Sequence, residues 1–138
     1  MVVEMYDHRK TMTRGEGKQM EIVKTRMGGV PLLQVVGDLD HETSPMLLAA
    51  AEETLDPKTA HILLDLEACH YVDSGGLRVL VQILKNVKSR LGWLGVIAPT
   101  KDVQRLLERV ALIGDPSFRV FPNRAGAAKQ LEAEALRN

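Results

Sequence analysis

The residues best suited to chemistry in this sequence form the segment Asp73-Ser74-Gly75-Gly76. A serine between an aspartate and two glycines could be a nucleophile, or a hydroxyl that another protein modifies. Glycine costs about 1 kcal/mol relative to alanine inside a helix, so helix stability does not explain the pair. Glycines do leave a bare backbone that another molecule can approach closely. The segment therefore predicts a site at a turn.

Two enzyme patterns share part of this segment, and the sequence argues against both. The segment matches most of the nucleophile motif of trypsin-like serine proteases, but those enzymes need two β-barrels, whereas this chain has 138 residues and an α/β pattern. The Gly-x-Ser-x-Gly elbow of hydrolases needs a glycine where Val72 stands. Its triad also ends on a histidine, and no histidine follows Ser74. We expect no catalytic residue and no enzyme; a serine-reactive probe tests the remaining hydrolase hypothesis.

Ser74 has a structural and a functional interpretation. Structurally, its hydroxyl could be the N-cap that accepts from a backbone N–H one turn on. Functionally, it could be phosphorylated, because a helix N-terminus offers free N–H groups and partial positive charge that tolerate a phosphate. The phosphate would add about 1.5–2 negative charges beside Asp73. Such a modification would weaken partner binding at this surface and leave the fold intact.

Composition restricts the other function classes. Lys plus Arg and Asp plus Glu both number 18, so net charge gives no support for nucleic-acid binding. Cys69 is the only cysteine, which excludes an intramolecular disulfide and a cysteine zinc cage; we expect it to fill apolar space. No apolar run approaches the ~18–20 residues that span a bilayer, and the polar N-terminus is no secretory signal. We expect a cytoplasmic protein without a membrane span.

The hydrophobic pattern predicts the elements that position this turn. Residues 1–18 show no sustained period and predict a flexible extension before a single domain over residues 19–138. Strands are predicted at 21–25, 30–36, 61–66, 93–98 and 118–121, and helices starting near 46, 74, 101 and 125. Ser44 before Pro45 predicts an N-cap for the first helix.

The resulting order, ββαβαβαβα, predicts an α/β fold with a mixed, mostly parallel sheet and right-handed crossovers. Gly28-Gly29 predicts the hairpin that makes the sheet mixed. Sites in such sheets lie at the carboxyl ends of the strands. The loops over residues 37–44 and 69–76 follow two strands and are therefore the candidate positions.

Three segments together carry a family resemblance. They are Val36-Gly37-Asp38-Leu39-Asp40, Ile62-Leu63-Leu64-Asp65-Leu66 and Tyr71-Val72-Asp73-Ser74-Gly75-Gly76-Leu77. In order and spacing the chain resembles a STAS domain of the bacterial anti-sigma-factor antagonist type, over about residues 20–136. The resemblance implies a STAS-like fold with about four helices. It also implies a binding protein that captures an anti-sigma factor when unphosphorylated and so regulates transcription.

The resemblance also implies partners and site residues. The anti-sigma factor is often itself a serine kinase, which would phosphorylate Ser74, and a phosphatase would reverse the mark. ATP would belong to that kinase, so this chain needs no cofactor. The positions assigned to partner contact are Asp38, Asp40, Asp73, Gly75, Gly76 and Leu77. Gly75 departs from the family pattern, which usually has serine or threonine there.

Two further interpretations concern the aspartates. Asp65 lies inside an apolar strand, and the order of chemical groups does not fit a receiver-type phosphoacceptor; we expect it to accept from backbone N–H groups of residues 69–74. Asp38, Asp40 and Asp73 could hold magnesium, but such clusters are more often solvated, so we expect no metal.

A second hypothesis keeps the fold and changes the role. The chain would be a constitutive STAS scaffold, either a subunit of a lipid-transport complex or a stressosome component, with Ser74 mainly a helix cap. Gene neighbourhood distinguishes the two, since an adjacent anti-sigma kinase favours the switch and a transport permease favours the scaffold.

Overall fold

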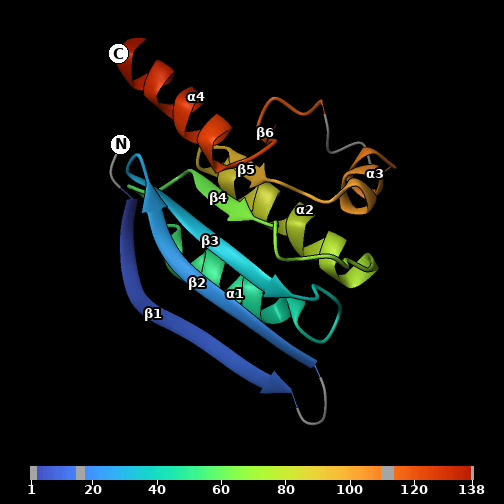
Figure 1. Ribbon diagram of the computed structural model, residues 1–138. Helices are drawn as coiled ribbons and strands as arrows, with labels where there is room; N and C mark the ends of the chain where they lie inside the picture. The colour runs from blue at the N-terminus through green and yellow to red at the C-terminus, as the bar shows by residue number, and fades with distance from the viewer. Residues whose placement is uncertain (1–2, 15–17, 110–113, 138) are drawn as a thin grey trace.

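The fold is a six-stranded mixed sheet covered by helices (Figure 1). The computed structural model describes residues 3–14, 18–109 and 114–137. The strands, in spatial as in chain order, are β1 (Val3–Arg14), β2 (Lys18–Met27), β3 (Val30–Gly37), β4 (Ile62–Asp65), β5 (Leu94–Ile97) and β6 (Phe118–Phe121). β1, β2 and β3 pair antiparallel, and β3 to β6 pair parallel.

Four helices connect or follow the parallel strands. They are α1 (Ser44–Thr54), α2 (Ser74–Ser89), α3 (Lys101–Arg109) and α4 (Arg124–Arg137). From β2 onward the predicted order ββαβαβαβα is confirmed. Of the helices in the described ranges, none combines the length and the apolar composition that crossing a bilayer requires.

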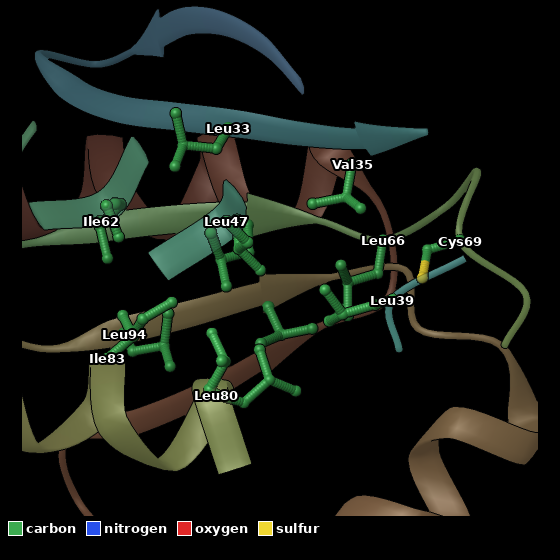
Figure 2. Close-up of a cluster of buried hydrophobic side chains, with 14 of the residues drawn as sticks. Leu33, Val35, Leu39, Leu47, Ile62, Leu66, Cys69, Leu80, Ile83 and Leu94 are labelled. Atoms are coloured by element: carbon green, nitrogen blue, oxygen red, sulfur yellow. The ribbon is translucent and has the colours of Figure 1, made fainter. Parts of the chain in front are cut away.

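Alternation along the strands divides the core into two parts. Leu33 and Val35 of β3 contribute to the larger part, which includes the buried faces of α1, α2 and α3. Leu32, which directly precedes Leu33 and points to the opposite face, belongs to a smaller part with Leu63 and Ala127 of α4. Figure 2 shows the larger part, whose labelled members include Leu39, Leu66 and Cys69 beyond the ends of β3 and β4. The apolar faces thus place the ends of β3 and β4 beside the start of α2.

The N-terminal segment differs from the sequence-based expectation. In place of a flexible extension, Val3–Arg14 forms β1, which pairs with β2 from Val3↔Met27 to Arg14↔Lys18. The register shifts between Met5 and Arg9, which fits a β-bulge. A bulge interrupts the period of two, and an edge strand is often charged, so the pattern gave no strand signal.

The start of α1 also differs from the expectation. Ser44 is the first helical residue and is buried, whereas Thr43 occupies the cap position. The loop ahead of the helix is organised by Asp40, whose Oδ1 accepts from the Glu42 and Thr43 amides at 2.9 and 3.0 Å. Pro45 lies in the first turn, as expected, since its missing N–H costs nothing there.

Candidate functional site

The candidate site is built from two loops that are joined by hydrogen bonds. β3 and β4 are parallel neighbours, so the loops that follow them leave the sheet at the same edge. The Leu39 amide donates to the Tyr71 carbonyl oxygen at 3.0 Å, and the Asp73 amide donates to the Leu39 carbonyl oxygen at 3.2 Å. These bonds form a parallel bridge between Leu39 and Val72, whose side chains are buried. The two loops therefore form one surface.

Asp73, and not Ser74, is the N-cap of α2. Its Oδ1 accepts from the Gly76 amide at 3.0 Å, and its backbone is extended, with φ −100°. Its Oδ2 accepts from the His41 amide of the other loop at 3.3 Å. Partial burial raises the pKa of Asp73, but the hydrogen bonds from Gly76 and His41 outweigh that and hold it below its ordinary value. The capping carboxylate is therefore ionised at neutral pH.

Ser74 is the first residue of α2 and is exposed. The interpretation of its hydroxyl as the helix cap is wrong, because Asp73 supplies that bond. Within the part of the chain that the structure describes, the Ser74 hydroxyl forms no hydrogen bond. An exposed hydroxyl without a structural bond is accessible to a modifying enzyme.

Gly75 and Gly76 allow the loop after β3 to pack closely against the start of α2. A Cβ on Gly75 would lie 2.7 Å from both Cα and Cβ of His41. A Cβ on Gly76 would overlap the carbonyl oxygen of Leu39. We expected these glycines to let another molecule approach the backbone closely. In the structure, the loop after β3 occupies the space next to both glycines. Gly76 is buried and Gly75 is half-buried.

The remaining predicted contact residues divide by exposure. Asp40 is only 3% exposed, and its Oδ1 accepts from two amides of its own loop and from the Thr43 hydroxyl. The structure therefore gives Asp40 a role in shaping the loop. Asp38 is half-buried at the start of that loop, and Leu77 is half-buried and packs partly on the core.

Two residues of the same surface were missed by the sequence analysis. The His41 side chain is 78% exposed, and its Nδ1 lies 3.6 Å from Asp73 Oδ2. Tyr71 is 51% exposed, although it is a large aromatic residue. Neither residue stands out in the sequence, because only the pairing of the loops brings His41 next to Asp73.

Asp65 is structural, but its partners differ from those expected. It is completely buried at the end of β4. Its Oδ2 accepts from Arg124 Nε at 2.6 Å, and its Oδ1 from the Glu67 amide at 2.9 Å. A buried carboxylate needs a paired cation, and here α4 provides it from 59 positions away. The loop over residues 69–74 does not supply these bonds.

Cys69 fills the space beneath the two loops, as expected of a single cysteine that acts as a small apolar side chain. It is fully buried near Leu39 and Leu66 (Figure 2). Its Sγ lies 3.6 Å from the Tyr71 carbonyl oxygen. Burial raises the pKa of the Cys69 thiol to about 11, so the thiolate is scarce near neutral pH. In the described residues, no group of three or more His, Cys, Asp or Glu side chains could hold a metal ion.

Comparisons with known proteins agree with this architecture. A family model described as the STAS domain matches residues 21–127. The chain is 31% identical over 108 residues to an anti-sigma F factor antagonist of Paenibacillus polymyxa, covering 75% of this chain and 88% of that relative. An anti-sigma factor antagonist from Mycobacterium paratuberculosis has a similar structure, with a TM-score of 0.71, 21% identity and coverage of 88% and 99%.

A third likeness concerns the fold alone. The phosphorylated form of the Bacillus cell fate determinant SpoIIAA matches with a TM-score of 0.61 and 16% identity, over 83% of this chain and 99% of that chain.

Proposed function

The chain belongs to the STAS domain family, among its anti-sigma factor antagonists, and from that premise we propose that it is a phosphorylation-switched binding protein. Members of this family are binding proteins and not enzymes. Unmodified, the chain would bind an anti-sigma factor in the cytoplasm and so free a sigma factor. Phosphorylated on Ser74, it would release that partner.

The observation that carries the proposal is the environment of Ser74. Its hydroxyl is exposed and takes no part in the fold, while the neighbouring Asp73 supplies the helix cap. In the proposed reaction a serine kinase transfers the γ-phosphoryl group of its own ATP to Ser74 Oγ. A P–O bond to the serine forms, the bond to ADP breaks, and the hydroxyl proton leaves to a base or to water. A phosphatase would hydrolyse the ester.

The proposed binding surface is the joined pair of loops with the first turn of α2. It contains exposed groups of different kinds, namely His41, Tyr71 and Ser74, with half-buried Asp38 and Leu77 at its edge. Asp73 and Gly75 would act mainly by holding the two loops in register, and Asp40 and Gly76 lie beneath the surface. A phosphate at the centre would place about two negative charges where the partner must pack. Burying such a charge unpaired in an interface is strongly unfavourable.

The test compares three variants against the anti-sigma factor kinase. Ser74→Ala should bind like the unmodified protein, since it adds no charge. Ser74→Asp should bind about 2–5 kcal/mol more weakly, which is more than tenfold in Kd. Ser89→Asp is the matched control at the other end of α2, and it should bind normally. Site mapping after kinase treatment should find phosphate on Ser74. Equal binding of Ser74→Asp and wild type would replace the switch with the constitutive scaffold.

A further inference from the structure

We propose that a phosphate on Ser74 is held within the chain itself, with the side chains of His41 and Arg78 as its counter-ions. This inference rests on the proposed phosphorylation of Ser74 and adds to it the residues that receive the charge. His41 comes from the loop after β3, and Arg78 comes from the second turn of α2. The two proposed counter-ions thus come from different elements on either side of Ser74 in the sequence.

His41 contacts the residues on both sides of Ser74. Its amide donates to Asp73 Oδ2 at 3.3 Å, and its Nδ1 lies 3.6 Å from the same oxygen. Its Cα lies 2.7 Å from where a Cβ on Gly75 would be. The side chain is nevertheless 78% exposed, so the imidazole can turn toward a group attached to Ser74. A protonated imidazole carries two N–H donors and a positive charge, both of which suit a phosphate oxygen.

Arg78 lies four residues after Ser74, which is the spacing of side chains that meet on one helix face. It is exposed, and it forms no ion pair within the described residues. A guanidinium presents paired donors that match phosphate oxygens. α2 contains no Asp or Glu after its cap, so no carboxylate on the helix competes for Arg78.

The negative groups around Ser74 explain why counter-ions are needed. Asp73 is adjacent and ionised, and both of its oxygens already accept from amides. Asp40 is buried and bonded within its loop, while Asp38 is half-buried and Glu42 is exposed beside His41. A phosphate dianion here would add to this negative charge. Two cations reduce that repulsion, and they stabilise the modified state without a change of fold.

This arrangement changes what the partner meets. In the unmodified protein Arg78 is an exposed cation one turn from Ser74, available to an acidic group of another protein. In the phosphorylated protein it is engaged by the phosphate. The modification would then both add negative charge to the surface and remove a cation from it.

The experiment uses the full chain with phosphoserine placed at position 74 during synthesis. The pKa of the phosphate is measured by phosphorus NMR, and the pKa of His41 by the NMR signals of its ring. In wild type the phosphate pKa should lie below the ~6 of an unperturbed phosphoserine. It should rise by roughly half a unit or more in His41→Gln and in Arg78→Gln. Reciprocally, the pKa of His41 should be higher in the phosphorylated chain than in the unmodified one.

Matched controls separate direct contacts from the general charge of the surface. His70→Gln removes another exposed histidine, and Lys85→Gln removes another exposed cation of α2; neither should move the phosphate pKa by more than about a tenth of a unit. A phosphate pKa that is the same in wild type and in a His41→Gln, Arg78→Gln double variant would overturn the inference, as would controls that shift it equally. Because no kinase is used, failure of Ser74 phosphorylation by a kinase would contradict the proposed function and leave this titration unaffected.

Discussion

Replacing Gly76 by alanine should weaken the hydrogen-bonded bridge between the two loops. The new Cβ would overlap the carbonyl oxygen of Leu39, which accepts from the Asp73 amide. Overpacking costs about 1–3 kcal/mol, and loss of that hydrogen bond about 0.5–1.5 kcal/mol. Alanine returns up to about 1 kcal/mol of helix propensity. The free energy of unfolding should therefore fall by about 0.5–4.5 kcal/mol, measured by urea denaturation with an unchanged m-value.

Two further glycine-to-alanine variants serve as controls for the stability change in Gly76→Ala. Gly75→Ala would place Cβ 2.7 Å from His41 and should cost less than Gly76→Ala, because that loop is more exposed. Gly126→Ala, in the first turns of α4, would place Cβ 3.3 Å from Asn123 Oδ1 and 3.4 Å from Pro122 Cδ, with no backbone atom among these neighbours, and should not destabilise the protein. If Gly76→Ala were as stable as Gly126→Ala, the close packing of the loops on α2 would be refuted.

Three other perturbations have defined outcomes. Asp73→Ala should lose about 0.5–2 kcal/mol of stability as a removed cap, whereas Ser74→Ala should stay within about 0.5 kcal/mol of wild type in the same urea experiment; the reverse order would restore Ser74 as the cap. Burial, together with the nearby Arg119 charge, lowers the pKa of His61, whose Nδ1 accepts from a backbone amide. The unfolded chain therefore binds the proton more readily, so stability should fall as the pH drops below about 6.5; His61→Asn should flatten that dependence in melting curves. Cys69, with a pKa of about 11, should react with a thiol reagent at pH 8 only as fast as the protein unfolds, and immediate labelling would contradict its burial.

The fold from β2 onward was predictable because apolar periods and turn residues are local signals. The strand at Ile62–Asp65 is a continuous apolar run, and α2 has one buried stripe. β1 was not predictable, because its stability comes from pairing with β2 and a register shift breaks its alternation. The sequence shows a strand clearly only where one face is buried in a regular alternation.

The position of the two candidate loops at one edge of the sheet was predictable from the sequence. The structural role of each side chain in those loops was not. The motif identified Ser74 and its glycines, yet aspartate and serine are both good N-caps, and only the observed bond from the Gly76 amide shows that Asp73 is the one that caps α2. Asp65 was recognised as structural, but its cation comes from Arg124, far along the chain. His41 was missed for the same reason: its contact with Asp73 exists only after the loops have paired.

The bridge between the two loops has a consequence for how this region opens. The amides of Gly37, Leu39 and Asp73 donate to the carbonyl oxygens of Ala68, Tyr71 and Leu39, respectively. Exposing any of these amides to water requires the loops to separate, so they should exchange with deuterium as one cooperative unit. A modification that strengthens contacts across the loops would slow exchange at all three amides together. Deuterium exchange at the Gly37 amide would then report on the modification of Ser74, although Gly37 ends β3 and Ser74 begins α2.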